Sequence, residues 1–294
     1  METKGKVAFV TGAAGGLGSG VVRACLAEGM TVAMADFDTD RIEAVRATLG
    51  EDRDRTYAVS LDVADYRTWT QAADEVEAQL GAVSWLINVV GIGAGSELAN
   101  DDPARLRVVF EVNVYGHWYG CRTFLPRMLS RKEPGHIVNV ASISGLLSHP
   151  GSAVYDASKH AVVGMTNSLR YELVGTNVGL SLACPGLMNT NFSGNSMSYM
   201  AGRASLPDAP GSRYSEMMKS GMDTDAAGRM ILSRAKEGRF WIFTHPHWKP
   251  ALDVIEAERN AAFGEPAEAG YTDGLPAASI QRHREAMEKS PRHS

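Results

Sequence analysis

Six short apolar runs that alternate with longer mixed segments constrain the fold more than any other feature. They read KVAFVTG, TVAMADFD, RTYAVSLDV, SWLINVVG, GHIVNVAS and VGLSLACPG. Nearly continuous apolar strands, each followed by a helix-length segment, are typical of a parallel sheet that helices bury on both faces. RFWIFT, at residues 239–244, adds a seventh strand. The sequence therefore predicts an α/β fold, a doubly wound parallel sheet with right-handed crossovers.

The chain of 294 residues is predicted to form one domain with an appendage. Residues 1–263 carry the alternating pattern, whereas residues 264–294 are polar, and we expect this tail to fray or to pack on a neighbouring subunit. Within the domain, residues 187–222 hold six methionines among Gly, Ser and Asn with little periodicity. Because thioether side chains repack easily, this segment is predicted to be a mobile flap over a substrate, and a plain surface loop is the alternative.

Charge and cysteine usage exclude several classes of function. A net charge of -5 without a long basic run gives no electrostatic footprint for nucleic acid or an anionic membrane. No apolar run reaches membrane-spanning length and METKGKVAFVTGAAGG lacks a secretory signal core, so we predict a cytoplasmic protein with a small-molecule partner. Cys25, Cys121 and Cys184 lack metal-ligand spacing. They are predicted to be buried small hydrophobes rather than a disulfide framework, a catalytic thiol or a metal site.

The first predicted strand ends in a glycine-rich turn, with Gly12, Gly16 and Gly18 in the pattern TGxxxGxG. A turn without side chains, followed from Leu17 by a helix, lets backbone N–H groups and the positive end of the helix dipole approach a pyrophosphate. A merely tight strand-to-helix turn is the alternative. Asp36 ends the next strand eighteen residues after Gly18, where a carboxylate accepts hydrogen bonds from an adenosine ribose. The sheet is therefore predicted to be of the Rossmann type.

Asp36 also predicts which dinucleotide binds. A 2′-phosphate would be repelled by this carboxylate, and no Arg or Lys occurs in GAAGGLG or beside ADFD to attract one. NAD is therefore favoured over NADP, with Arg41 interpreted as a solvated residue of the following helix rather than a phosphate ligand. Asp62 and Val63 end the third strand and are predicted to border the adenine, although Asp62 also has the chemistry of a helix N-cap.

Tyr155 and Lys159 lie four residues apart in SAVYDASKHA. On a helix this spacing places both side chains on one face, where the ammonium favours the ionised phenol. An unperturbed phenol ionises at about pH 10, so a tyrosine base that works near neutrality needs such a neighbour. An ordinary half-exposed helix surface is the alternative.

With these motifs in order, residues 1 to about 245 resemble a classical short-chain dehydrogenase/reductase. The resemblance implies that Tyr155 is the catalytic acid and base, and that Lys159 lowers its pKa while holding the nicotinamide ribose. It implies that Ser142, in NVASISG, hydrogen-bonds the substrate oxygen, with Ser144 as the substitute if the register differs by two. Asn113, in EVNVYG, would hold a water beside Lys159 and complete a proton relay.

The same resemblance assigns further cofactor residues. In CPGLMNT, Pro185 and Gly186 would shape a turn and Thr190 would reach the nicotinamide carboxamide. Asn88 and Gly91 match the ends of the Asn-Asn-Ala-Gly segment that the family shows after its fourth strand. Here the segment reads Asn88-Val89-Val90-Gly91. This departure bears on the predicted cofactor affinity and on the predicted stability of the sheet at Val89 and Val90, and it leaves the predicted fold unchanged.

The function predicted from these features is oxidation of a secondary alcohol to a ketone by an NAD-dependent dehydrogenase. An alcohol must lose a proton while its carbon gives up a hydride, so a base and an oxygen-positioning donor have to meet at the nicotinamide. The predicted substrate pocket is largely apolar and suits a bulky aromatic or alicyclic alcohol. Its predicted members are Ile143, Leu146, His149, Met188 and Phe192. His149 would orient a polar substituent, or else lie on a surface loop.

Several alternatives remain open. An NADPH-dependent ketone reductase is disfavoured by Asp36, and a steroid or terpene alcohol dehydrogenase is a further alternative. A non-catalytic nucleotide-sensing protein would be expected to lose Tyr155 or Lys159. The flap and the FTHPHWKPALDVIEAERNAAFG ending are also weakly similar to family members that oxidise lignin-derived aryl alcohols. The resemblance further implies a homotetramer or homodimer that assembles through the long helices at residues 105–128 and 155–173.

Overall fold

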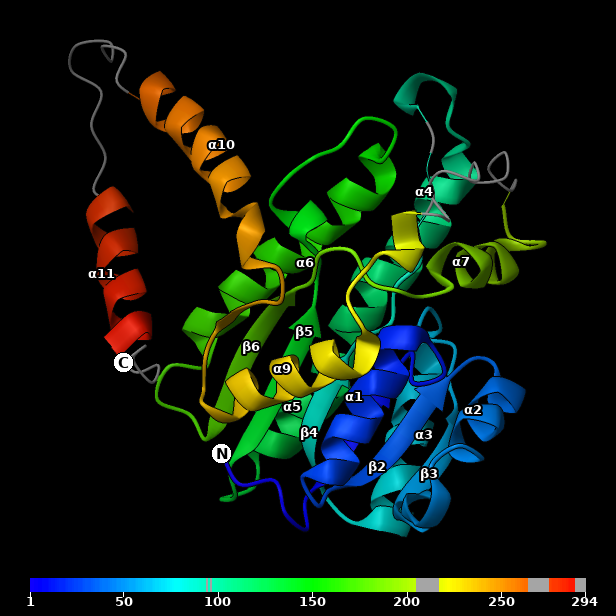
Figure 1. Cartoon of the computed structure of the whole chain (residues 1–294). Coiled ribbons are helices and arrows are strands. Elements are labelled where there is room, and N and C mark those ends of the chain that lie inside the picture. The colour runs from blue at the N-terminus through cyan, green and yellow to red at the C-terminus, as the bar shows by residue number, and fades with distance from the viewer. Residues whose placement is uncertain (94, 96, 205–216, 264–274, 289–294) are drawn as a thin grey trace.

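A seven-stranded parallel sheet, in the order β3-β2-β1-β4-β5-β6-β7, forms the centre of the molecule (Figure 1). The computed structural model describes residues 1–93, 95, 97–204, 217–263 and 275–288. The strands are β1 Val7–Thr11, β2 Thr31–Asp36, β3 Thr56–Ser60, β4 Val83–Asn88, β5 Gly135–Val140, β6 Val178–Cys184 and β7 Trp241–Phe243. All seven predicted strands are present, and the predicted Rossmann-type fold is confirmed.

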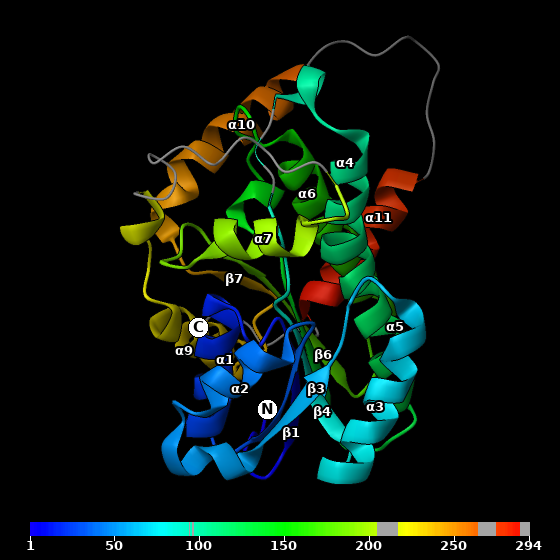
Figure 2. The ribbon, with the colours of Figure 1, turned by 90° about the vertical axis from the view of Figure 1, so that its right-hand side faces the viewer.

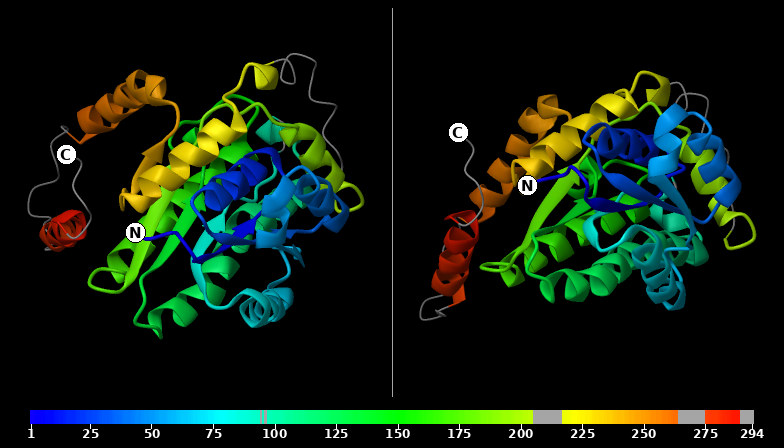
Figure 3. Two further views of the ribbon diagram at one scale, coloured as in Figure 1. Left: turned by 60° about the horizontal axis from the view of Figure 1, so that its bottom comes forward. Right: turned by 90° about the horizontal axis from the view of Figure 1, so that it is seen from below.

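Helices cover both faces of the sheet (Figure 3). One face carries α1 Gly16–Ala27, α2 Thr39–Arg46 and α9 Thr224–Lys236, and the other carries α3 Tyr66–Leu80, α5 Gly116–Leu129 and α6 Ala153–Glu172. The shorter turns are η1 Gly50–Arg55, η2 Leu98–Asn100, η4 Ile143–Gly145 and η5 Pro246–Trp248. The buried residues accordingly form two clusters, one on each face of the sheet.

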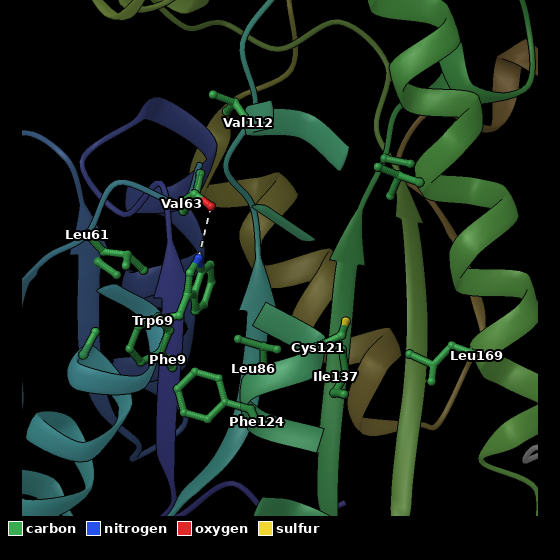
Figure 4. Packing of buried hydrophobic residues seen from close by; sticks show 14 of the residues in the cluster. Phe9, Leu61, Val63, Trp69, Leu86, Val112, Cys121, Phe124, Ile137 and Leu169 are labelled. Carbon is green, nitrogen blue, oxygen red and sulfur yellow. Dashed lines mark hydrogen bonds between the residues drawn. The ribbon is translucent and has the colours of Figure 1, made fainter. Parts of the chain in front are cut away.

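The larger cluster is built on aromatic side chains (Figure 4). Phe9 of β1 packs against Phe124 of α5, with ring centroids 4.8 Å apart, and against Trp69 of α3 at 6.1 Å. The indole N–H of Trp69 donates to the carbonyl of Val63 at 3.1 Å, so this buried polar group is satisfied. The contacts bind β1 to two helices directly below the glycine-rich turn.

Local capping decides where helices begin near the sheet edge. Asp65 is the N-cap of α3 and its carboxylate accepts from the N–H of Arg67 at 3.1 Å. The suggested cap at Asp62 is therefore wrong, because the chain takes three more residues to leave β3 before it turns into the helix. Asp38 caps α2 in the same manner, accepting from Arg41.

One helix is interrupted by a π-helical turn. α4, Pro103–Phe110, continues through Glu111–Tyr115, which is π-helical, into α5. Such a turn accommodates one residue more than an α-helical turn and is frequent at functional sites. It holds Asn113 fully buried, whereas Tyr115 is exposed.

The outer segments differ in part from expectation. α7, Phe192–Met200, is a regular helix inside the predicted flap, and residues 205–216 of that flap lie outside the described residues. α10, Lys249–Ala262, extends away from the sheet, and α11, Leu275–Glu288, lies beside α6 (Figures 1 and 2). The described part of the tail thus packs on its own chain, with the Tyr171 hydroxyl 3.0 Å from His283 Nδ1. In the described segments, no helix combines the length and apolarity needed to span a bilayer.

Candidate active site

A cavity of about 540 Å³ opens at the carboxyl ends of the strands. The strand order reverses between β1 and β4, and ligands of doubly wound sheets bind at this switch point. The cavity is lined by the segments that follow β1 to β6, by one face of α6 and by α7. Of the predicted site residues, it is lined by Gly12, Gly16, Leu17, Gly18, Asp36, Asp62, Val63, Gly91, Ser142, Ile143, His149, Tyr155, Lys159, Pro185, Gly186, Met188, Thr190 and Phe192.

The glycine-rich turn forms one wall of this cavity and has no room for side chains. Gly12 has a φ of 66°, and a Cβ on Gly18 would lie 2.0 Å from the Gly12 carbonyl oxygen. A Cβ on Gly16 would lie 2.5 Å from the methyl group of Thr190. Gly15, the N-cap of α1, offers no side-chain oxygen to the first N–H groups of that helix. These donors and the positive end of the helix dipole suit an anionic group such as a pyrophosphate.

At the end of β2, the Asp36 carboxylate faces the cavity next to a cation. Its two oxygens accept from the N–H groups of Ala14 at 3.1 Å and Asp38 at 3.3 Å. Burial raises the pKa of Asp36, while these hydrogen bonds and the charge of Arg41 oppose that rise. Arg41, interpreted from the sequence as solvated, instead lines the cavity and donates to the Ala14 carbonyl at 3.2 Å. The long side chain folds back from α2 toward the glycine-rich turn.

The next corner, at the end of β3, is closed by the far end of α7. Asp62 accepts from the Tyr199 hydroxyl at 2.6 Å and from the guanidinium of Arg203 at 3.4 Å. The Tyr199 ring also meets Phe37 edge-on, with centroids 5.0 Å apart. Burial, followed by the bond to Asp62, raises the pKa of Tyr199. The sequence analysis missed Tyr199 and Phe37, for which an aromatic residue in the flap and one beside Asp36 were the available signals.

Three of the four predicted catalytic residues, Ser142, Tyr155 and Lys159, line the same cavity. Tyr155 and Lys159 share one face of α6, and Lys159 Nζ lies 5.8 Å from the centre of the Tyr155 ring. Lys159 is 3% exposed, donates to the Val140 carbonyl at 3.2 Å, and has a pKa that burial lowers to about 8. Ser142, just after β5, donates to the Pro185 carbonyl at 3.4 Å and accepts from the N–H of Ser144 at 3.1 Å.

Asn113 lies one layer behind the cavity surface. Its amide accepts from the N–H of Ile92 at 2.8 Å and donates to the Ile92 carbonyl and the Ser158 hydroxyl, both at 2.9 Å. A Cβ on Gly91 would lie 3.0 Å from Lys159 Nζ and 3.5 Å from Asn113 Oδ1. Asn113 therefore ties the segment after β4 to α6 next to Lys159, and its proposed contact with a water remains a proposal.

Asn88 also lies outside the cavity lining, in the interior of the sheet. Its amide donates to Asn139 of β5 at 2.9 Å, and Asn139 donates in turn to Thr166 of α6 at 3.0 Å. Asn88 therefore links β4 to β5 and, through Asn139, to α6. It supports the site from the buried core rather than from the cavity surface. The unusual Val89 and Val90 do line the cavity, and their N–H groups donate to Thr11 Oγ1 at 3.1 and 3.3 Å.

The substrate side of the cavity, formed by residues after β5 and β6 and by α7, is aromatic and sulfur-rich. Phe192 meets the Tyr155 ring edge-on at 5.8 Å. His149 is half-buried and meets Trp248 in the same way at 5.8 Å. Leu146 is absent from the lining, because it packs against the larger core cluster. Met217 and Met218 of the predicted flap also line this side. Lining residues not predicted from the sequence include Pro150, Ser152, Leu187, Asn195 and Trp248.

Charged groups are distributed unevenly around this cavity. Among the described lining residues, the carboxylates and the guanidinium belong to Asp36, Asp62 and Arg41 at the ends of β2 and β3, and Lys159 is the central ammonium. The substrate side carries no Asp, Glu, Lys or Arg in the described part of its lining. The three cysteines are buried elsewhere, as predicted, and burial raises each thiol pKa to about 12, which keeps them unreactive.

Comparison with known proteins agrees with this geometry. The family model for short chain dehydrogenase matches residues 6–200, and the chain belongs to that family. It is thus an oxidoreductase whose site takes a nicotinamide cofactor and a small-molecule substrate. The family predicted from the motifs is confirmed.

Several curated relatives carry named activities, and two of them illustrate the range. The 1-deoxy-11-beta-hydroxypentalenate dehydrogenase of Streptomyces exfoliatus is 37% identical over 192 residues, which is 65% of this chain and 70% of the relative. The 2-(R)-hydroxypropyl-CoM dehydrogenase of Xanthobacter autotrophicus is 35% identical over 189 residues, 63% of this chain and 75% of the relative.

Solved structures resemble nearly the whole chain. A putative short-chain dehydrogenase from Novosphingobium aromaticivorans superposes with a TM-score of 0.83 at 32% identity, covering 97% of this chain and 99% of the other. A short chain dehydrogenase/reductase from Burkholderia phymatum in complex with NAD gives 0.82 at 31%, covering 92% and 100%. A Burkholderia cenocepacia relative in complex with NADP gives 0.70 at 25%, covering 89% and 97%.

Proposed function

We propose that this chain is an NAD-dependent dehydrogenase that oxidises a neutral, bulky aromatic or alicyclic secondary alcohol to a ketone. The observation that carries the proposal is the meeting of Tyr155, Lys159 and Ser142 in one cavity, beside a glycine-rich turn suited to a pyrophosphate. In the reaction the alcohol carbon loses a hydride and its oxygen loses a proton, so NAD and an alcohol yield NADH, a ketone and a proton.

Each side chain has one task in this scheme. The Ser142 hydroxyl and the Tyr155 phenol hold the substrate oxygen from two sides, and Tyr155 takes its proton. The buried Lys159 ammonium favours the ionised phenol, because little water screens the two groups from each other. When bound, the nicotinamide supplies the hydride acceptor. Asn113 keeps Lys159 and the segment after β4 in place and would hold the relay water.

Different residues would hold different parts of the dinucleotide. Gly12, Gly16 and Gly18 would hold the pyrophosphate, while Pro185, Gly186 and Thr190 would border the nicotinamide. Asp36 would accept from the adenosine ribose and repel a 2′-phosphate, which supports NAD. Arg41, on the same wall, is the observation that favours the second candidate, an NADPH-dependent ketone reductase. The relatives solved with NAD and with NADP are consistent with either assignment.

The lining of the substrate side supports a neutral substrate. Aromatic rings and thioethers bury apolar surface, while a carboxylate or phosphate on the substrate would meet no cation in the described lining of that side. Ile143, Met188 and Phe192 would pack on the ring system of the alcohol, and His149 would bond a polar substituent. The relative named for a hydroxypentalenate supports an alicyclic ring system, whereas that compound carries a carboxylate, so the neutral charge proposed here rests on the lining alone.

We also propose self-association through the exposed aromatic residues at the junction of the π-helical turn and α5. Trp118 of α5 is 57% exposed, and Tyr115, the last residue of the π-helical turn, is 48% exposed. Large exposed aromatic side chains are enriched at protein interfaces. This surface overlaps residues 105–128, where the family resemblance places a contact between copies, and a homodimer or homotetramer follows.

The test is an absorbance assay for reduced nicotinamide with NAD and NADP in parallel, against aryl, alicyclic and steroid secondary alcohols and carboxylated analogues of each. Formation of NADH with one neutral class supports the proposal. Turnover with NADP alone supports the reductase. Silence across the panel with NADH binding intact contradicts catalysis and favours a nucleotide-sensing protein.

A further inference from the structure

His245 lies directly behind the Pro185–Leu187 turn and is absent from the cavity lining. It follows β7 and is half-buried. A Cβ on Gly186 would lie 2.7 Å from His245 Cγ, so the imidazole packs against bare backbone. The described hydrogen bonds of His245 go to Gly186, Leu187 and Thr244, so none of them reaches the glycine-rich turn or the catalytic residues.

The backbone of the turn bonds to both ring nitrogens of His245. The N–H of Gly186 donates to Nδ1 at 3.1 Å, and Nε2 lies 3.0 Å from the Leu187 carbonyl oxygen. An amide can only donate and a carbonyl can only accept, so Nδ1 is bare and Nε2 carries the proton. The Thr244 hydroxyl, 2.7 Å from Nδ1, donates to the same lone pair. The neutral ring with its proton on Nε2 is the form that satisfies all of these contacts.

The turn is held from its other sides as well. The Pro185 carbonyl accepts from the Ser142 hydroxyl at 3.4 Å and from the N–H of Ile143 at 2.8 Å. The Leu187 carbonyl accepts a second bond, from the N–H of Met222 at 2.9 Å. Ser142, Met222 and His245 therefore hold the turn from three sides.

We propose that neutral His245 is a positioning residue that holds the Pro185–Leu187 turn in the shape required by the nicotinamide end of the cofactor, and that protonation of its ring releases the turn. This inference rests on the proposed function. A proton on Nδ1 would point at the N–H of Gly186 and abolish that bond. Burial lowers the pKa of His245, in the direction that preserves the neutral ring.

Among the described groups packed around His245, His245 is the one that both titrates and bonds to the turn. His247 of η5 faces it with ring centroids 5.5 Å apart, and α9 places the guanidinium of Arg234 on the Phe243 carbonyl two residues earlier. The segments of Gly186, Leu187 and Met222 present backbone groups. After burial, the proximity of His247 also lowers the pKa of His245, whereas the bond to the Leu187 carbonyl opposes that change.

The experiment compares NADH with ADP-ribose, which lacks the nicotinamide, by calorimetric titration of the full chain. His245→Phe removes both hydrogen bonds and is expected to weaken NADH binding about tenfold while ADP-ribose binds as before. His245→Asn places an amide oxygen near the Nδ1 position and is expected to recover part of the loss. His247→Gln, an exposed neighbour outside the turn, is the matched control.

The pH dependence gives a second readout. From about pH 7.5 to about pH 5, NADH binding to the wild type should weaken relative to ADP-ribose, whereas His245→Asn should show no such divergence. Equal loss of both ligands, or unchanged NADH binding in His245→Phe, overturns the inference. A wild type that binds neither NADH nor NADPH overturns the proposed function together with it. Binding of NADH without alcohol oxidation overturns the catalytic proposal alone.

Discussion

His117 and Lys159, on two different helices, donate to the same oxygen, the carbonyl of Val140, each at 3.2 Å. Because the carbonyl accepts, His117 donates through Nε2–H. Burial, reinforced by the charge of Lys159, lowers the pKa of His117 to about 3. The site therefore contains one buried cation and one histidine that must stay neutral beside it.

This relationship predicts sensitivity to acid. His136, buried between β4 and β6, likewise has a pKa that burial lowers to about 3. Unfolded histidines bind protons below about pH 6.5, whereas these two do not, so the free energy of unfolding falls as pH decreases. We expect a loss of about 1 kcal/mol per pH unit per histidine between about pH 6 and pH 4. Urea denaturation at several pH values measures it.

Non-titrating variants identify the source of that slope. His117→Gln and His136→Gln should each make the unfolding free energy less dependent on pH, while the exposed His247→Gln should leave the dependence as it is. An unchanged slope in both buried variants would assign acid sensitivity to other groups.

Tyr155→Phe removes the phenol that we propose takes the substrate proton. We expect kcat to fall about 10²–10⁴-fold, because general base catalysis contributes that much, while NADH binding remains. Tyr171→Phe, on the same helix but exposed and bonded to His283, is the matched control. Steady-state kinetics and NADH titration measure the two effects, and near-normal turnover by Tyr155→Phe would refute its role as the base.

Asp36→Ser should relax cofactor selectivity. The substitution removes the buried carboxylate that we propose repels a 2′-phosphate, and it leaves Arg41 beside the vacated position. We expect the ratio of kcat/KM for NAD to that for NADP to fall about 10²-fold. Adding Arg41→Leu should reverse much of the gain with NADP. A ratio that stays constant in both variants would show that neither side chain meets the ribose.

Tyr199→Phe should loosen the end of α7 that closes over Asp62. The hydrogen bond at 2.6 Å disappears while the ring contact with Phe37 is kept. We expect faster amide exchange in residues 192–200 and NADH and ADP-ribose binding weakened alike by about threefold to tenfold. Tyr57→Phe, which removes an exposed bond to Glu75 at 2.7 Å, is the control. Unaltered exchange would show that the bond does not hold the helix.

Gly18→Ala should destabilise the fold even without cofactor. Its Cβ would lie 2.0 Å from the Gly12 oxygen, a backbone atom that cannot rotate away. We expect a loss of about 2 kcal/mol or more in the free energy of unfolding. Gly164→Ala, inside α6 with no atom near its Cβ, should instead add about 1 kcal/mol. Equal stabilities of the two variants would contradict the packing seen at the turn.

Local patterns predicted the fold, and they also explain why the residues proposed for the site line one cavity. The alternation of apolar runs defines strands whose carboxyl ends share one edge, so residues that follow those strands converge regardless of their separation in sequence. Ser142 and Lys159 line one cavity for that reason. Asp36 reaches it by the same rule, because it is the last residue of β2.

The missed contacts depend on packing that no local pattern encodes. Tyr199 meets Asp62 across 137 positions of sequence, and the aperiodic composition around it gave no sign of α7. Arg41 turns back to Ala14 through a choice of side-chain rotamers. Asp62 and Asp65 have equal capping chemistry, and only the path of the chain after β3 selects Asp65. The Asn88 side chain lies in the core because Asn88 pairs with Asn139 on the neighbouring strand and bonds to its side chain.

The π-helical turn at Glu111–Tyr115 absorbs one residue that a regular α-helix would not hold. Deleting a residue inside this turn would regularise the helix and leave α5 nearly in phase with α4, so His117 would stay beside Val140. The loss would fall on Asn113, whose amide reaches Ile92 and Ser158 from this turn. A deletion within α5 itself would instead rotate the residues beyond it by about 100°. Libraries built on this scaffold should therefore vary exposed side chains such as Trp118 and keep the residue count of both segments fixed.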